Sequence, residues 1–241
     1  MSQLFRKQSP LCRLKKLKTS LASNLVIAIV TILTALQPCI AKPNRAKAAN
    51  SDAKIIVRVY NLAEVPGNTL VKSEKEAKRV FKGVGIETDW LDCPLSAELA
   101  QKLPGCEKNL GPTFLNLRIV PRFEMAEAGF RGAALGFALA AKEGGVHASI
   151  FYHRVLETAQ EGPASAAQIL GHAMAHEIGH LLLGSNSHSP TGMMSAQWNR
   201  KELKDATLEL LRFNADQVER MRKDVLTRAE QMAPLTKQTA V

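Results

Sequence analysis

Hydrophobic and polar residues alternate in several short segments of the chain, which is the pattern of β-strands that bury one face. The clearest segment is KIIVRVY at residues 54–60, where β-branched residues dominate. Similar alternation predicts a sheet with strands at residues 54–60, 86–91, 113–120, 133–140 and 146–155. The last two strands flank a Lys-Glu-Gly-Gly sequence at 142–145, which favours a hairpin turn.

Apolar residues recur at helical spacing in the segments between and after these strands. Residues 69–83 form one amphipathic pattern that ends in glycine. A longer helix is predicted to begin at Ser165, where Gln168 completes a capping box, and to end at Gly184. Residues from Asn199 onward predict one or two further helices. This order predicts an α/β or α+β fold, in which helices pack on a twisted mixed sheet.

The formal net charge of +10 is unevenly distributed along the 241 residues. Residues 1–48 contain nine Lys and Arg residues and no Asp or Glu, whereas residues 49–241 contain 23 basic and 22 acidic residues. A nearly neutral domain therefore follows a strongly basic leader. Because the excess charge lies outside the domain, it does not indicate a nucleic-acid partner.

The leader has the order of parts that is typical of a secretory signal peptide. A basic run precedes the apolar stretch at residues 21–36, and an Ala-Lys-Ala sequence at 46–48 offers a cleavage site. We predict a signal peptide at 1–48, a single domain at 49–241 and a secreted or periplasmic location. An uncleaved membrane anchor is the alternative, and in both cases the protein contacts the membrane only through its leader.

Two of the four cysteines lie in the leader, and Cys93 and Cys106 remain in the domain. An even number of cysteines in an oxidising compartment favours a disulfide between them. Two unpaired thiols are the alternative.

The predicted long helix carries the sequence HEIGH at residues 176–180. Two histidines four positions apart on a helix differ by about 40° in direction and 6 Å in height, so both imidazoles can reach one metal ion. Glu177 projects beside His176 and His180, where its carboxylate could accept a proton from water without binding the metal. His188 follows the predicted helix end and is a candidate third ligand.

The chain resembles the metzincin zinc endopeptidases, which belong to the HExxH zincins. The resemblance rests on the HExxH helix, the glycine that ends it, the third histidine and a methionine-containing turn, TGMM at residues 191–194. It implies a zincin-like fold, with the active-site helix packed on the sheet and followed by a Met turn and C-terminal helices. It also implies a site with these members: Zn²⁺ bound by His176, His180 and His188, Glu177 as general base, and Met194 in the Met turn.

The spacing of the motif departs from the family pattern. Metzincins have HExxHxxGxxH, whereas this chain has HExxHxxxGxxxH, with one additional residue on each side of the glycine. Glu202 or Glu209 on the following helix is therefore an alternative third ligand, as in the gluzincins.

Other residues are expected to have structural roles. His172 is expected to be packed or hydrogen-bonded, and His147 and His153 to face the same side of one strand. Gly179 is expected to allow another backbone to approach the helix closely. Four basic residues are expected to form a solvated helix face: Arg220, Arg222, Lys223 and Arg228.

The sequence as a whole predicts a secreted zinc-dependent endopeptidase that acts on a peptide or protein substrate. By the resemblance, an edge strand within residues 133–155 would bind an extended peptide. One alternative is a non-catalytic zinc-binding or interaction domain of the same fold, and another is the same peptidase tethered by its leader. Cleavage preference and oligomeric state are left open.

Overall fold

The structure is a computed structural model that describes residues 53–107, 110–122, 134–140 and 145–238. These residues belong to one compact unit, Asn50–Val241. The predicted signal peptide lies outside the described residues, as does most of the predicted turn at 142–145. Within the described residues, no helix combines the length and the apolar character that are needed to cross a bilayer.

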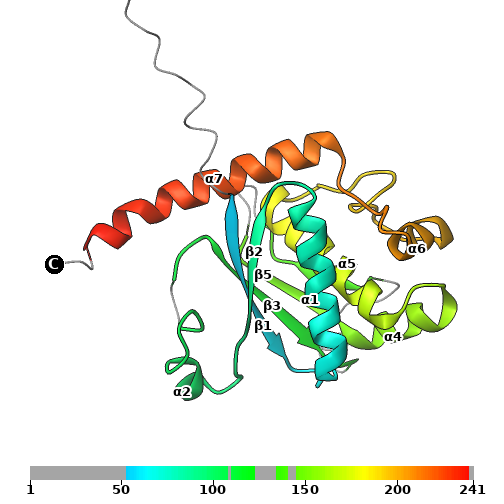
Figure 1. The fold of residues 1–241 in the computed structure, drawn as a ribbon, viewed down its shortest axis with the longest axis horizontal. Coiled ribbons are helices and arrows are strands. Elements are labelled where there is room, and N and C mark those ends of the chain that lie inside the picture. The colour runs from blue at the N-terminus through cyan, green and yellow to red at the C-terminus, as the bar shows by residue number, and fades with distance from the viewer. Residues whose placement is uncertain (1–52, 108–109, 123–133, 141–144, 239–241) are drawn as a thin grey trace, which may run out of the picture. The chain divides into compact units, whose positions relative to one another are not determined.

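A five-stranded sheet with the order β2-β1-β3-β5-β4 lies at the centre of the domain (Figure 1). The strands are β1 (Lys54–Asn61), β2 (Glu87–Asp92), β3 (Phe114–Val120), β4 (Gly136–Ala138) and β5 (His147–Phe151). The first four in that order run parallel, and β4 pairs antiparallel with β5 at the edge, with Gly136 opposite Ile150. The mixed sheet is therefore as predicted.

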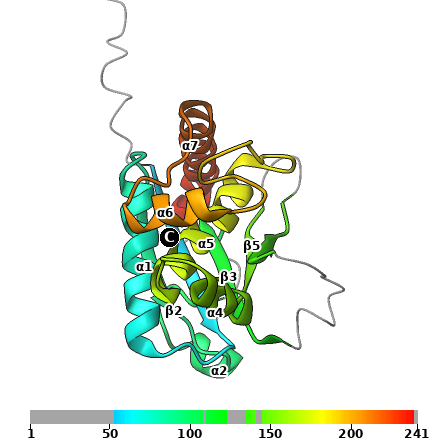
Figure 2. The same ribbon diagram turned by 90° about the vertical axis from the view of Figure 1, so that its right-hand side faces the viewer.

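Three helices cover one side of this sheet. The helices of the domain are α1 (Gly67–Lys82), α2 (Ala97–Ala100), α4 (Tyr152–Glu161), α5 (Ala166–Leu183), α6 (Arg200–Thr207) and α7 (Ala215–Gln238). Figures 1 and 2 show α1, α4 and α5 on the same side of the strands, with α2 on the other. The α/β class and the packing of the motif helix α5 on the sheet are confirmed.

The main core lies between the sheet and α5. Alternate residues of β1, namely Ile55, Val57 and Val59, are buried in the same cluster as Leu170 and Met174 of α5. Most of α5 is apolar and buried on all sides, because α1, α6 and α7 also pack against it. The helix that carries the metal-binding motif is thus the best-enclosed helix among the described residues.

A disulfide-closed loop covers part of the other side of the sheet. Cys93 and Cys106 are bonded, as predicted. Arg58 of β1 is buried, donates a hydrogen bond to the Glu107 carbonyl and lies 5.7 Å from the Phe114 ring centroid. The loop therefore supplies an acceptor for a charge that would otherwise be buried without one.

The prediction of one strand over residues 146–155 is wrong in its second half. Strand β5 ends at Phe151, and helix α4 begins at Tyr152. His153 therefore lies on α4, and the expectation that it shares a strand face with His147 is also wrong. The physical reason is that the spacing of apolar residues over so short a segment does not separate a strand from an amphipathic helix, and Val155 is buried on α4.

Arg228 does not belong to a solvated face, so the prediction for this residue is wrong. Its side chain is 5% exposed and donates to the carbonyls of Pro112, Gly145 and Leu181 at 2.8–3.0 Å. It also pairs with Asp224 at 2.5 Å. This arginine joins α7 to the end of α5 and to two loops.

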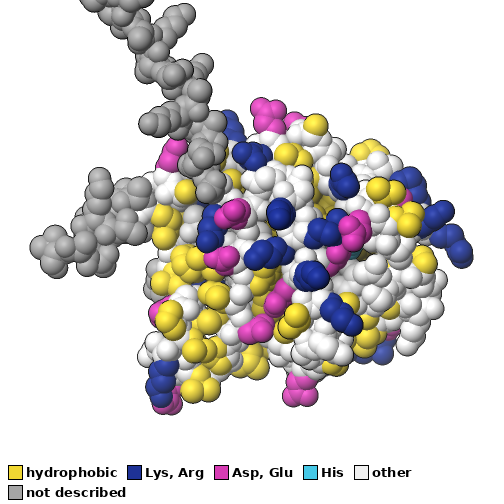
Figure 3. Space-filling view, viewed as in Figure 1, with side chains coloured by type: hydrophobic (Ala, Val, Ile, Leu, Met, Phe, Trp, Pro, Cys, Tyr) yellow, Lys and Arg dark blue, Asp and Glu magenta, His cyan; other side chains and the backbone are white. Residues whose placement is uncertain are grey.

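The neighbouring basic residues of α7 are less buried. Arg220 donates to the Leu183 carbonyl at 2.9 Å and Arg222 to the Gly85 carbonyl at 2.7 Å, whereas Lys223 is exposed, as predicted. Over the face seen in Figure 3, Lys and Arg side chains are interspersed with Asp and Glu. This mixture agrees with the near-neutral composition of residues 49–241.

We expect Arg228→Met to lower the free energy of unfolding by about 3–5 kcal/mol, because three carbonyls and Asp224 lose their charged partner. Urea denaturation measures this difference. Lys223→Met on the same helix is the matched control and should change stability by less than about 0.5 kcal/mol. Equal stabilities of the two variants would contradict the role of Arg228 in joining these segments.

Candidate metal centre

Local signals set both ends of α5. The Ser165 side chain accepts from the Gln168 amide, and the Gln168 side chain accepts from the Ser165 amide, which completes the predicted capping box. At the other end Gly184 has a φ of 81°, in the region that glycine adopts without strain. The chain can therefore reverse there and return along the helix.

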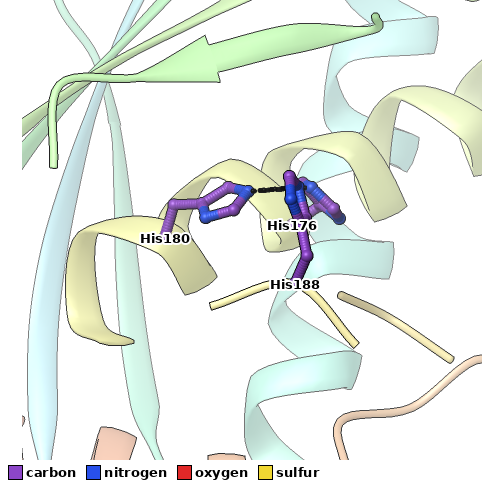
Figure 4. Close-up of side chains that lie close together, drawn as sticks. All are labelled: His176, His180 and His188. Atoms are coloured by element: carbon purple, nitrogen blue, oxygen red, sulfur yellow. Dashed lines mark hydrogen bonds between the residues drawn. The ribbon is translucent and has the colours of Figure 1, made fainter. Parts of the chain in front are cut away.

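Three histidines meet beside this reversal. His176 and His180 project from α5 one turn apart, and His188 reaches them from the loop that follows (Figure 4). The Nε2 atom of His180 lies 3.1 Å from the Nε2 atoms of both His176 and His188. The structure therefore brings together the three residues predicted as metal ligands.

The donor set fits a zinc ion. Bonds of 2.0–2.1 Å in a tetrahedral site separate the ligand nitrogens by about 3.3 Å, which is close to the distances seen here. The His176 Nδ1 atom lies 2.7 Å from the Met193 carbonyl oxygen. Since a carbonyl can only accept, Nδ1 carries the proton of a neutral ring and Nε2 keeps a free lone pair. Such an Nε2 atom can bind a metal ion.

Burial keeps two of these imidazoles neutral. It lowers the pKa of His176 to about 4, and the nearby His188 acts in the same direction. Burial also lowers the pKa of His180 to about 3, with contributions from both neighbouring histidines. The neutral form that the fold favours is the form that binds metal.

Glu177 lies beside the histidines as a buried carboxylate. Its side chain is 5% exposed, and its Oε2 atom has no hydrogen-bond partner among the described residues. Burial raises the pKa of Glu177 to about 8. A Cβ atom on Gly136 of β4 would lie 2.4 Å from the Ser149 carbonyl oxygen of β5 and 3.0 Å from Glu177 Oε1, so the close pairing with β5 requires the glycine, which lies beside this side chain.

A cavity of about 580 Å³ opens in front of the histidines. Its walls come from β4, α4, α5 and the segment around residues 195–198. Glu177 and all three histidines line it. His188 is exposed, so the cluster is accessible from the cavity.

The predicted Met turn lies directly behind α5. Met193 and Met194 are both fully buried, and Ser189 donates its amide to the Met194 carbonyl at 2.8 Å. A Cβ atom on Gly179 would lie 2.7 Å from the Met194 sulfur and 2.9 Å from the Phe213 ring. Gly179 does permit a close approach, but the expectation that a backbone approaches is wrong, because the neighbours are side chains.

Sequence reasoning missed two residues that support the histidines. The indole of Trp198 lies edge-on to His176, with ring centroids 5.8 Å apart, and donates Nε1 to the Met193 carbonyl at 3.4 Å. The Ser187 hydroxyl lies 2.8 Å from His180 Nδ1. Neither residue belongs to a recognisable motif, so no sequence signal could have identified them.

The alternative third ligands have other partners in the structure. Glu202 is buried and accepts from the Asn199 amide at 3.2 Å, which caps α6. Glu209 is exposed and pairs with Arg79 at 3.6 Å. His172 is fully buried and its Nδ1 atom lies 2.8 Å from the Gln168 carbonyl, in agreement with the expected structural role.

No protein-family model and no curated protein matches the chain. Among solved structures, it is similar to a zinc-dependent peptidase from Methanocorpusculum labreanum, with a TM-score of 0.45 and 16% identity over 68% of this chain and 99% of that one. It is also similar to archaemetzincin from Methanopyrus kandleri, with a TM-score of 0.44 and 12% identity over 73% and 98%.

A third similar structure is metalloproteinase-II from Bacteroides fragilis, with a TM-score of 0.44 and 14% identity over 72% of this chain and 54% of that one. Because all three TM-scores lie below 0.5, the chemistry of this chain has to be inferred from its own side chains.

We expect His188→Ala to weaken zinc binding by more than about 100-fold, because it removes one of three converging nitrogens. Glu202→Gln is the matched control. It keeps a side chain that can cap α6, so it should bind zinc as the wild type does. Zinc affinity can be measured by competition with a chromophoric chelator. The reverse result, a large loss only in Glu202→Gln, would support a gluzincin-type ligand set.

Proposed function

We propose that this protein is a zinc-dependent endopeptidase. The observation that carries the proposal is the position of Glu177, a buried carboxylate with a free oxygen beside three converging histidines in an open cavity. Burying an unpartnered carboxyl group costs free energy, so its presence at the site indicates a functional role. We assign Glu177 the role of a general base next to a metal ion.

We assign each residue one role in peptide hydrolysis. His176, His180 and His188 would hold the ion through neutral Nε2 atoms. A zinc ion held in this way supplies Lewis acidity, which makes water a stronger acid and polarises a carbonyl group. Glu177 accepts the proton that the attacking water loses, and then donates it to the nitrogen of the amine that leaves. Burial raises the pKa of Glu177, whereas a zinc ion beside it would favour the ionised form that accepts the proton.

The edge strand β4 is our candidate for substrate binding. Leu135 and Leu139 exchange backbone hydrogen bonds with β5. Because these bonds alternate along an antiparallel pair, the main-chain groups of Gly136 and Ala138 point away from β5. An extended peptide could pair with them as an added strand and would then pass Glu177, which contacts Gly136. A peptide bound along its main chain favours cleavage within a chain.

Glu177→Gln should retain zinc and lose about 10²- to 10⁴-fold in the rate of hydrolysis, because the amide cannot accept the proton of water. The assay follows products by mass spectrometry from a broad peptide library. Glu219→Gln, on the exposed surface of α7, is the control and should keep full activity.

Full activity in Glu177→Gln would refute the assigned base. If the wild type binds zinc but cleaves no member of the library and binds no hydroxamate inhibitor, the non-catalytic alternative gains support.

We also propose that the protein is exported and that residues 1–48 are removed. The apolar stretch and the cleavage site support this, and a disulfide between Cys93 and Cys106 agrees with an oxidising compartment. We expect N-terminal sequencing of the exported protein to begin near residue 49. An intact N-terminus in the membrane fraction would instead support the tethered form.

A further inference from the structure

We propose that Ser187 is a positioning residue that holds the orientation of the His180 ring. The inference rests on the proposed function, since it concerns how the chain prepares a ligand for zinc. It requires no contact between Ser187 and the substrate.

The loop turns Ser187 inward while its neighbours face solvent. Ser187 is 5% exposed, whereas Ser185, Asn186 and His188 are exposed. Asn186 has a φ of 60°, a left-handed conformation that asparagine tolerates better than most residues. This local reversal directs the next side chain towards α5, where its Oγ atom lies 2.8 Å from His180 Nδ1.

The hydroxyl can hold the His180 ring in place whichever nitrogen carries the proton, because a serine hydroxyl both accepts and donates. A neutral imidazole carries one proton, and only the other nitrogen can bind a metal ion. When Nδ1–H donates to the Ser187 oxygen, Nε2 keeps its lone pair and points towards the cluster. Such partners on the second nitrogen typically contribute 10- to 100-fold to metal affinity.

His180 is the ligand for which this matters most. Its Nε2 atom is the one that lies 3.1 Å from both other Nε2 atoms, so a rotation of this ring changes two of the spacings in the cluster. The corresponding partner of His176 is the main-chain oxygen of Met193, which no substitution removes. Ser187 is therefore the support that a single side-chain change can test.

The altered motif spacing accounts for the presence of this serine. Three residues separate Gly184 from His188, and Ser187 is the last of them. The shorter family pattern has two residues in this interval. The longer interval thus gives the chain room for an exposed reversal at Asn186 followed by an inward-facing residue.

The test compares zinc affinity and the mobility of the His180 ring in four variants. Ser187→Ala should weaken zinc binding by about 10- to 100-fold. In the metal-free protein, NMR relaxation of the ring C–H groups should show that the His180 ring is more mobile in Ser187→Ala than in the wild type. Ser185→Ala removes a hydroxyl two residues away on the same loop and should change neither quantity. Ser187→Thr and Ser187→Val have the same shape, with and without a hydroxyl, so only the threonine should preserve wild-type affinity.

Several outcomes would overturn the inference. It fails if Ser187→Ala keeps wild-type zinc affinity and an unchanged mobility of the His180 ring, or if threonine and valine weaken binding equally. The thermal unfolding midpoint of each metal-free variant separates a loss of fold from a loss of ligand orientation, and the threonine and valine pair decides the matter if the alanine variant does not fold. A wild-type protein that binds no zinc would refute the proposed function, while the ring mobility of His180 in the metal-free protein would still test the contact itself.

Discussion

Helix α5 has to carry imidazoles and a carboxylate through the middle of a hydrophobic core, and most features of the site follow from that constraint. A buried polar atom costs about 1–3 kcal/mol when it has no partner, so each imidazole needs one. His172 has the Gln168 carbonyl, His176 has the Met193 carbonyl and His180 has Ser187. Each hydrogen bond also fixes the orientation of its ring. The contacts that offset the cost of burial therefore also direct the Nε2 atoms of His176 and His180 towards the cluster.

The segment after α5 must therefore be held as firmly as the helix itself. The Ser189 amide donates to the Met194 carbonyl, so the loop that carries His188 is tied to the Met turn. The Met193 amide donates to the Arg212 carbonyl, which ties the Met turn to the segment before α7. Arg220 and Arg228 of α7 donate hydrogen bonds to the carbonyls of Leu183 and Leu181, near the end of α5. The C-terminal helices thus serve the site indirectly, by fixing the end of the helix and the loop that returns from it.

The sequence was informative wherever a local rule decides the structure. The capping box at Ser165, the reversal at Gly184 and the helical spacing of His176 and His180 depend only on residues close in the chain, and the structure has all three features. It was uninformative where partners come from distant segments. Arg228 is buried because carbonyls from positions 112, 145 and 181 meet beside it, and Trp198 contacts His176 only after two reversals of the chain. The prediction that the strand continues past Phe151 was wrong for a related reason. Tertiary packing decides whether so short an apolar segment forms a strand or a helix, and here Val155 is buried on α4.

The exposure of the ligands bears on whether the centre is structural or catalytic. Structural zinc sites are closed by four protein ligands, whereas catalytic sites have three and keep one position open. Among the described residues, the cluster contains three histidines, of which one is buried, one half-buried and one exposed to the cavity. Glu177 adds a cost that a structural site would not require, because its side chain is buried and its Oε2 atom has no partner among the described residues. An open ligand set together with a buried, unpaired carboxyl group is accounted for by the proposed catalytic role and not by a purely structural one.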